Sequence, residues 1–225
     1  MAGSRAPVDS RSALLAGASG LVGRALLALL LDSPRYRRVY VVLRRAVADL
    51  AGHAKLVTTR VDFAALPALP PVDDVFIALG TTIRAAGSQQ AFRQVDFDAV
   101  VGTARAARAA GARRLMVVSA LGADAASPVF YNRVKGEMQQ AVVTLGYDSV
   151  VIAQPSLLLG DRSALGQPRR AGEAWAQRLL RPLSGWLPAR VRPIRAEDVA
   201  RALLRAALEA APGVRILGCA EMQPR

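Results

Sequence analysis

A tyrosine and a lysine stand four residues apart, at Tyr131 and Lys135, in a stretch expected to be helical. Because residues four apart lie on one face of a helix, both side chains can serve a single substrate. Ser119 ends an apolar run twelve residues before the tyrosine. In such a trio the serine holds a carbonyl oxygen, the tyrosine exchanges a proton with it, and the lysine ammonium favours the ionised phenol. The three side chains therefore predict acid–base chemistry at a carbonyl or an alcohol.

The scarcity of lysine supports this interpretation. Arginine occurs 28 times, whereas Lys55 and Lys135 are the two lysines of the chain, so a compact ammonium stands where this chemistry needs one. The single histidine, His53, and the single cysteine, Cys219, exclude a Ser-His-Asp triad, a zinc site and an intrachain disulfide. We expect no metal site. One reduced cysteine predicts a cytoplasmic protein.

A glycine triplet lies between a strand expected at 12–16 and a helix expected at 21–31. Gly17 permits a tight turn, Gly20 lets backbone amides approach a pyrophosphate, and Gly23 allows the helix to pack closely on the strand. The N-terminus of the helix then presents unsatisfied N–H groups and a positive dipole to the phosphates. This spacing, in a strand–turn–helix context, predicts a dinucleotide site.

The next strand, expected at 39–43, ends in Arg44 and Arg45. A site that prefers NAD has an Asp or Glu here, which accepts a hydrogen bond from the ribose 2′-hydroxyl. No acidic residue occurs between Pro34 and Ala48. Two guanidinium groups instead offer donors for a 2′-phosphate, and Arg44 could also stack on the adenine. We therefore expect the cofactor to be NADP (as NADPH) in preference to NAD.

Strands and helices are expected to alternate along the rest of the chain. Further strands are expected at 56–61, 74–79, 115–119, 149–153 and 214–217, and further helices at 88–110, 128–145, 173–180 and 196–209. This alternation predicts an α/β fold with a doubly wound parallel sheet, that is, an NAD(P)-binding Rossmann fold. Asp62, after the third strand, could then reach the adenine edge. Gly80 and Thr81, after the fourth, would lie beside the cofactor.

The whole chain, 1–225, is expected to form a single domain. Residues 1–10 are polar and predict a flexible tail. Residues 156–195 are rich in proline, glycine and arginine and contain Trp175 and Trp186, which predicts a small C-terminal cap over the carboxyl edge of the sheet.

The net charge of +13 bears on the partners of this protein. The basic residues are scattered without a dense run and without interleaved aromatics, so we expect no nucleic-acid partner. The apolar stretch at 12–31 could pass for a membrane anchor, but Arg24 and three glycines interrupt it. We expect the two tryptophans of the cap to pack on the protein, without peripheral membrane contact. The expected partner is a small-molecule substrate, and a homodimer is compatible with the sequence.

Taken together, the chain resembles a short-chain dehydrogenase/reductase of the atypical type. More closely, it is similar to the HIV Tat-interactive oxidoreductase-like family and to bacterial proteins labelled NAD(P)H-binding or sugar-nucleotide epimerase-like. The segments that carry this resemblance are GASGLVGR (17–24), VLRR (42–45), VDF (61–63), LGTTIRAAG (79–87), FRQVDFDAV (92–100), VVSALGAD (117–124), YNRVKGE (131–137) and QPSLLLGDR (154–162).

The resemblance implies catalysis by Ser119, Tyr131 and Lys135. It also implies cofactor contacts from Gly17, Ser19, Gly20, Leu21, Val22, Arg44, Asp62, Leu79, Gly80, Thr81, Tyr131, Lys135, Pro155 and Leu158. Many reductases of the larger class add an asparagine that relays protons, yet Asn132 is the single asparagine of this chain. A water chain or Lys135 itself would have to take that role.

Three functions are open at this point. The first is hydride transfer between NADPH and a small carbonyl compound or alcohol. The second is a non-catalytic, NADPH-sensing regulatory protein in which the cofactor orders the cap. The third is a sugar-nucleotide epimerase-like enzyme, for which the short C-terminal region leaves little room.

Overall fold

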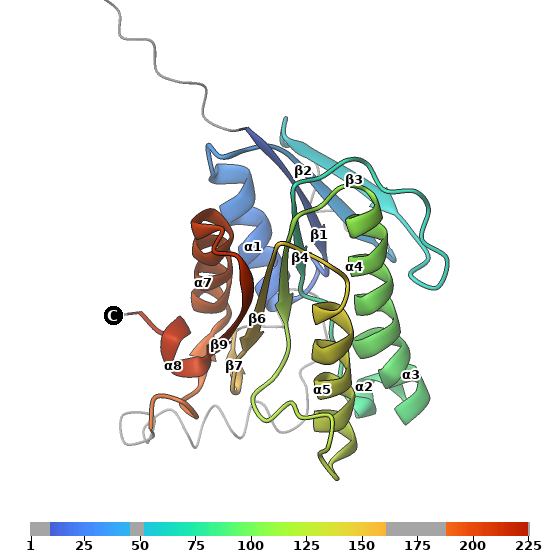
Figure 1. Ribbon diagram of the computed structural model, residues 1–225, viewed down its shortest axis with the longest axis vertical. Coiled ribbons are helices and arrows are strands. Elements are labelled where there is room, and N and C mark those ends of the chain that lie inside the picture. The colour runs from blue at the N-terminus through green and yellow to red at the C-terminus, as the bar shows by residue number, and fades with distance from the viewer. Residues whose placement is uncertain (1–9, 46–51, 161–187, 225) are drawn as a thin grey trace, which may run out of the picture.

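The sheet at the centre of the molecule is parallel throughout. The computed structural model describes residues 10–45, 52–160 and 188–224. Within them, seven strands form one sheet in the order β3-β2-β1-β4-β5-β6-β9 (Figure 1). Its strands are β1 (Arg11–Ala16), β2 (Tyr36–Leu43), β3 (Leu56–Arg60), β4 (Asp74–Ile77), β5 (Arg114–Val118), β6 (Ser149–Gln154) and β9 (Gly213–Gly218).

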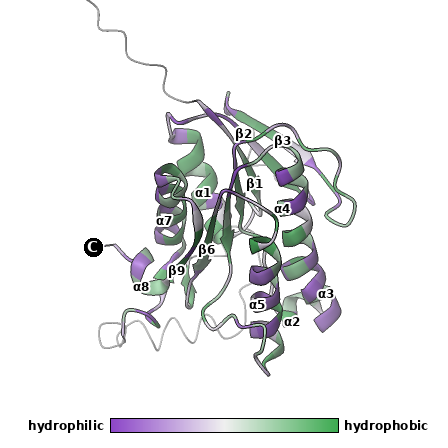
Figure 2. Cartoon of the chain, viewed as in Figure 1, coloured by the Kyte–Doolittle hydropathy of each residue, from purple (hydrophilic) through white to green (hydrophobic). Residues whose placement is uncertain are grey.

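Helices cover both faces of this sheet (Figure 1). One face carries α1 and α7, and the other carries α4 and α5. Because side chains alternate along a strand, Leu15 of β1 packs with α1 and α7, while Leu14 packs with α4 and α5. The apolar sides of these helices face the sheet (Figure 2). The helices are α1 (Leu21–Asp32), α2 (Ile83–Ala86), α3 (Gln89–Arg93), η2 (Gln94–Asp98), α4 (Ala99–Ala109), α5 (Phe130–Val143), α7 (Ala196–Glu209) and α8 (Cys219–Met222).

The order of the strands reverses beside β1. The chain passes from β1 outward to β2 and β3, and then returns to β4 on the other side of β1. In open α/β sheets, the crevice at the carboxyl ends of the strands flanking such a reversal is where ligands bind. Here Ala16 of β1 pairs with Ile77 of β4, so Gly17 and Ala78 begin the two loops at this crevice. The predicted doubly wound Rossmann fold is confirmed.

The helix predicted over 88–110 differs from an ordinary α-helix in its middle. The helical run begins and ends as predicted, and Ser88 caps it by accepting a hydrogen bond from the Ala91 amide at 3.0 Å. Between α3 and α4, however, the five residues of η2 form a π-helical segment. A π-helix widens the turn by one residue, which changes the face that each following side chain presents.

The predicted start of α5 at Ser127 and Pro128 is wrong. The helix begins at Phe130, because the Ser127 hydroxyl accepts a hydrogen bond from the Val129 amide at 3.2 Å and closes a local turn instead. Such side-chain turns compete with helix caps for serine. The displaced start leaves Tyr131 in the first turn of α5.

The predicted cap at 156–195 falls mostly outside the described residues, as do the helix expected at 173–180, both tryptophans and nearly all of the tail at 1–10. Its two described flanks pair as a second, two-stranded parallel sheet of β7 (Leu158–Leu159) and β8 (Ile194–Arg195). Strands of two residues carry no periodicity, so the sequence did not predict them. Within the described ranges, none of the helices is both long and apolar enough to cross a membrane.

The amino ends of the strands are fixed by a buried polar network around Asp74. The Tyr36 hydroxyl donates to Asp74 Oδ2 at 2.6 Å, Arg114 Nε donates to Oδ1, and Arg11 lies 3.6 Å from Oδ2. Burial, reinforced by the nearby Asp74 charge, raises the pKa of Tyr36 far above its ordinary value. Burial also raises the pKa of Asp74, against the effect of both arginines. This network lies at the opposite end of the sheet from the glycine turn.

Candidate cofactor and active site

The glycine turn is held together by close backbone contacts. Gly17 has a φ of +93°, and a Cβ there would lie 2.5 Å from the backbone carbon and oxygen of Ala78. A Cβ at Gly23 would lie 2.0 Å from the Gly17 oxygen. At Gly20, by contrast, the nearest atom would be 3.5 Å away. Gly17 and Gly23 therefore close the turn against the sheet, whereas Gly20 leaves room for a ligand.

Helix α1 starts directly after this turn. Its N-cap is Gly20, which has no side chain to cap the helix, and the next residues are Leu21 and Val22. Amides in the first turn of a helix have no partner within the helix and lie at the positive end of its dipole. The Val22 side chain is buried in the core, so only its backbone N–H can face a ligand. Ser19 lies half-buried in the same turn. The turn and the helix start together can receive a diphosphate.

Two arginines lie at the neighbouring strand end. Arg44 and Arg45 follow β2 directly and are exposed, and β2 is the neighbour of β1 in the sheet. Asp62 follows β3, one strand further out, and is also exposed. Its Oδ1 accepts a hydrogen bond from the Ala64 amide at 2.9 Å, which holds the carboxylate in a turn. All three side chains thus belong to the carboxyl edge of the sheet, where the sequence predicted them.

The loop after β4 meets the predicted catalytic lysine. A Cβ on Gly80 would lie 3.7 Å from Lys135 Nζ, and the Lys135 side chain is buried. Lys135 Nζ lies 2.8 Å from Asp96 Oδ1, at angles outside those of a hydrogen bond, so the contact is an ion pair. The Thr81 amide donates to the other carboxylate oxygen, Asp96 Oδ2, at 2.8 Å. Leu79, half-buried, packs on the α4–α5 core beside them.

Ser119 follows β5 and is held by a chain of amides. Gln139 Nε2 donates to Ser119 Oγ at 2.6 Å, and Gln154 Nε2 donates to Gln139 Oε1 at 3.1 Å. Tyr131, Lys135 and Gln139 recur at intervals of four along α5 and so form one stripe of the helix. Ser119 is therefore bound to the stripe that carries the other two predicted catalytic residues.

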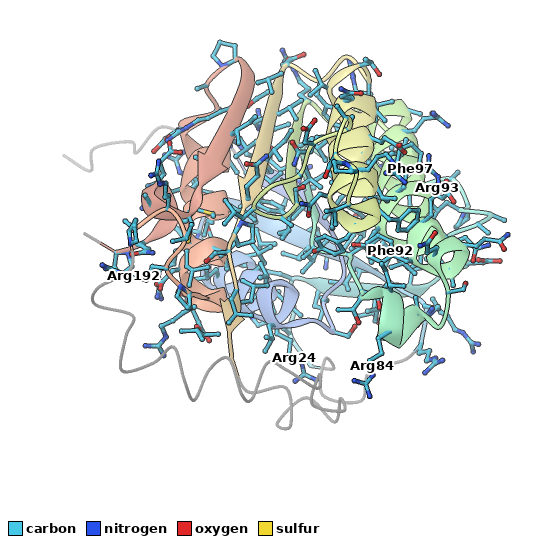
Figure 3. The ribbon with its side chains drawn as sticks, turned by 90° about the horizontal axis from the view of Figure 1, so that it is seen from below. Arg24, Arg84, Phe92, Arg93, Phe97 and Arg192 are labelled. Carbon is cyan, nitrogen blue, oxygen red and sulfur yellow. The ribbon has the colours of Figure 1, made fainter. Side chains whose placement is uncertain are left out.

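Tyr131 is half-buried, and its ring packs on Phe92 with 5.3 Å between the ring centroids. Phe92 lies inside the molecule, whereas Arg84 of α2 points outward (Figure 3). The first turn of α5 is also tied to the loop before it, because the Asp124 amide donates to the Asn132 carbonyl oxygen at 3.0 Å. Phe92 thus packs against the ring of Tyr131, and the backbone of the same helical turn is anchored to the loop before it.

Pro155 and Leu158 lie where the chain leaves β6 towards β7. The Pro155 carbonyl oxygen accepts a hydrogen bond from the Leu121 amide at 2.9 Å. Leu158 and Leu21 pack on the same α1–α7 core. A Cβ on Gly160 would lie 2.8 Å from the Leu21 side chain, so the segment after β6 passes over the start of α1.

Two polar residues of this site, Asp96 and Gln139, were missed from the sequence. The sequence pattern that could have revealed them is a polar residue on an otherwise apolar stripe of a helix. Asp96 comes four residues after Phe92 and four before Val100, which are both fully buried. Gln139 likewise continues the buried stripe four residues after Lys135. A carboxylate or amide in such a place needs a buried partner.

The strand order, the glycine turn at the reversal and the helices on both faces define an NAD(P)-binding Rossmann protein. A comparison with known families matches residues 17–154 to the family described as NAD(P)H-binding, and the chain belongs to that family. The predicted nicotinamide cofactor is thereby supported, while the preference for NADP remains a prediction.

Relatives among curated proteins match most of the chain. Protein FMP52, mitochondrial, of Lodderomyces elongisporus is 31% identical over 204 residues, which cover 85% of this chain and 84% of the relative. The protein of the same name from Aspergillus fumigatus is 37% identical over 210 residues and 88% of each chain. The predicted cytoplasmic localisation is contradicted by these names, which point to mitochondria. A lone cysteine argues against structural disulfides, but it does not distinguish between compartments that keep thiols reduced.

Solved structures share the fold at low identity. MoeE5 in complex with UDP-glucuronic acid and NAD gives a TM-score of 0.71 at 22% identity, over 92% of this chain and 75% of that one. The enzyme WbmH of Bordetella bronchiseptica, in complex with NAD+, gives 0.68 at 16% identity, over 93% and 76%. A UDP-N-acetylglucosamine 4-epimerase from Methanobrevibacter ruminantium gives 0.68 at 16% identity, over 93% and 77%.

Proposed function

We propose that this protein is an NADPH-dependent oxidoreductase of the short-chain dehydrogenase/reductase type, similar to the HIV Tat-interactive oxidoreductase-like proteins. It would transfer a hydride between NADPH and a small carbonyl compound or alcohol. The observation that carries the proposal is the buried ammonium of Lys135 beside Gly80. Gly80 lies in the loop that borders the same crevice as the glycine turn, so one ligand can meet both.

The residues around the crevice have complementary roles in this proposal. The amides at the start of α1 hold the diphosphate, and Arg44 and Arg45 hold the 2′-phosphate. An ammonium has three N–H donors, so Lys135 retains donors for the nicotinamide ribose hydroxyls beside its contact with Asp96. The bound nicotinamide supplies the hydride that reduces the carbonyl carbon.

The proton and the orientation of the substrate come from the protein. In the reducing direction Tyr131 gives its phenolic proton to the carbonyl oxygen, which becomes the hydroxyl of the alcohol product. Gln139 donates its hydrogen bond to Ser119 Oγ, so the proton of Ser119 itself remains available for that carbonyl oxygen. This direction of the hydrogen bond is the one that a serine needs in order to donate to the carbonyl oxygen of a substrate.

The cofactor preference is tested by titration with NADPH and NADH, followed by thermal shift or fluorescence. NADPH should stabilise the folded protein by about 2.7 kcal/mol at a hundredfold excess over Kd. Arg44→Gln should weaken NADPH roughly tenfold or more and weaken NADH much less, because a charge-assisted hydrogen bond to the 2′-phosphate contributes about 1.5–3 kcal/mol. Arg37→Gln is the matched control, since Arg37 is exposed near the opposite end of the same strand.

The comparison of NADPH with NADH separates a wrong cofactor preference from a wrong function. Equal responses to NADPH and NADH would contradict the role of the arginines. Flat responses to both would contradict the proposed function as a whole.

Catalysis is tested separately with Tyr131→Phe and a panel of aldehydes and ketones. The proposal expects wild-type turnover, its loss in the variant, and unchanged NADPH binding. A wild-type protein that binds NADPH but turns over no carbonyl compound would instead favour the NADPH-sensing function.

An epimerase-like enzyme is the second candidate, because the neighbour from Methanobrevibacter ruminantium is a sugar-nucleotide epimerase. It predicts interconversion of UDP-sugars with no net consumption of NADPH. The same Tyr131→Phe variant would abolish it, so the substrate panel distinguishes these two enzymes.

A further inference from the structure

Asp96 is a fully buried carboxylate with no place in the mechanism described so far. It lies in the π-helical segment η2, between Phe92 and Val100, on the side of the helical run that faces the core. Transferring a carboxylate from water to such a position is strongly unfavourable unless charged or hydrogen-bonded partners meet it. π-helical turns within α-helices are frequent at functional sites, because they redirect a side chain. The position therefore requires an explanation from its partners.

Both partners of Asp96 belong to the candidate site. Oδ1 lies 2.8 Å from Lys135 Nζ of α5, and Oδ2 accepts the Thr81 amide of the loop after β4 at 2.8 Å. One carboxylate thus joins three elements that are distant in the sequence. A Cβ on Gly80 would lie 3.4 Å from Oδ1 and 3.7 Å from the ammonium. The loop at Gly80 therefore lies directly against the two charged groups, which are both buried.

We propose that Asp96 is a positioning residue, which fixes the Lys135 ammonium and the Gly80–Thr81 loop as one unit. Its first effect is electrostatic, because it supplies the counter-charge that a buried ammonium needs. Its second effect is geometric, because the lysine and the loop cannot move independently while one carboxylate holds both. The inference rests on the proposed function in one respect, namely that Lys135 and this loop contact the nicotinamide ribose.

The first test uses the protein without any nucleotide. The chain has two lysines, so acetylation by acetic anhydride, followed by peptide mass spectrometry, reports on each ammonium. Lys55, which donates to the Leu31 and Ser33 carbonyl oxygens at 2.8 and 2.9 Å, is the internal reference. In Asp96→Asn, Lys135 loses its buried counter-charge and should be acetylated roughly tenfold faster relative to Lys55, a factor that corresponds to about 1.4 kcal/mol.

Asp98→Asn is the matched control. Asp98 belongs to the same π-helical segment and is exposed, and the substitution removes the same charge. It should leave the labelling of Lys135 unchanged. Equal labelling of Lys135 in wild type and Asp96→Asn, with native circular dichroism, would overturn the proposal.

The second test asks whether the positioning serves the cofactor. Asp96→Asn should weaken NADPH about tenfold, whereas Asp98→Asn should not, and the KM for a carbonyl substrate should stay within twofold. A wild type that binds NADPH and an Asp96→Asn variant of equal affinity would overturn the positioning role. A wild type that binds neither NADPH nor NADH would overturn the proposed function instead, and the labelling result would still report whether Asp96 holds the lysine.

A comparison of Lys135→Met with the double variant keeps the proposal testable if Asp96→Asn alone does not fold. Lys135→Met leaves the carboxylate buried beside a neutral side chain, so its melting temperature should fall below that of the wild type. Adding Asp96→Asn to Lys135→Met removes that unpaired charge and should raise the melting temperature again. A double variant that melts no higher than Lys135→Met would show that the two side chains are not coupled and would overturn the proposal.

Discussion

Replacing the glycines of the 17–23 turn by alanine should produce two different defects. At Gly17, alanine would have to adopt a φ of +93°, and its Cβ would lie 2.5 Å from two backbone atoms of Ala78. The left-handed conformation costs roughly 1–2 kcal/mol in a residue with a Cβ. The ends of β1 and β4 must also separate to relieve this contact, and such overpacking typically costs about 1–3 kcal/mol. We expect Gly17→Ala to lose about 2–5 kcal/mol of unfolding free energy, the sum of these two costs.

Gly20→Ala should behave in the opposite way. Gly20 has a φ of −84°, which alanine adopts readily, and a Cβ there would meet no atom closer than 3.5 Å. The unfolding free energy should therefore stay within about 0.5 kcal/mol of the wild type. The new methyl group would instead occupy the space in which backbone amides approach a diphosphate. NADPH binding should weaken at least tenfold.

Urea denaturation followed by circular dichroism measures the first effect, and NADPH titration measures the second. Gly111→Ala is the control for conformation alone, because Gly111 has a φ of +98° and a Cβ there would have no atom within 4 Å. Its loss should be limited to roughly 1–2 kcal/mol. A Gly17→Ala variant as stable as Gly111→Ala would refute the close approach at Ala78. A Gly20→Ala variant with wild-type NADPH affinity would refute the assignment of this turn to the phosphates.

Two further predictions concern hydrogen bonding and pH. Gln139→Leu removes the hydrogen-bond donor to Ser119 Oγ while keeping a similar side-chain volume, so turnover should fall about tenfold with NADPH affinity unchanged. The control is Gln140→Leu at the exposed neighbouring position. Equal turnover in the two variants would contradict the role of the hydrogen bond. Burial raises the pKa of Tyr36 and of Tyr147 above the ordinary value of 10.0. The folded state then keeps two protons that the unfolded state releases, so the unfolding free energy should fall above pH 10 by about 1.4 kcal/mol per pH unit for each tyrosine. Urea titrations between about pH 9 and 11.5 should show a shallower fall in Tyr147→Phe, and an unchanged slope in that variant would contradict its buried, protonated state.

The sequence predicted the fold because its signals are local. Continuous apolar runs marked the buried strands, glycine spacing marked the turn, and the four-residue interval placed Tyr131 and Lys135 on one stripe of α5. Patterns of this kind report which face of an element is buried. They do not report what that face will meet. The predicted helix start at Ser127 was wrong for a related reason. The competing hydrogen bond from the Val129 amide to Ser127 depends on a turn geometry that the residue types alone do not fix.

The partner of Lys135 could not be predicted for the same physical reason. Asp96 precedes Lys135 by 39 residues and lies on a different helix, and the π-helical segment that carries it has no periodicity signal of its own. Gln139 is comparable, since its contact with Ser119 joins α5 to the end of β5. The prediction of a cytoplasmic localisation was wrong for a different reason, because one reduced cysteine is compatible with more than one compartment.

The buried polar groups of the site also bear on how a cofactor would bind. Asp96, Lys135 and Gln139 each occupy a helix position that would otherwise hold an apolar core residue, and each is met by a group from another element. A buried network of this kind is stable only when all its members are in place, since each unpaired member is costly. The lysine and the serine should therefore already be positioned in the protein without nucleotide. Cofactor binding should then change the positions of these side chains very little. The slow acetylation of Lys135 should therefore be as evident before NADPH is added as after it.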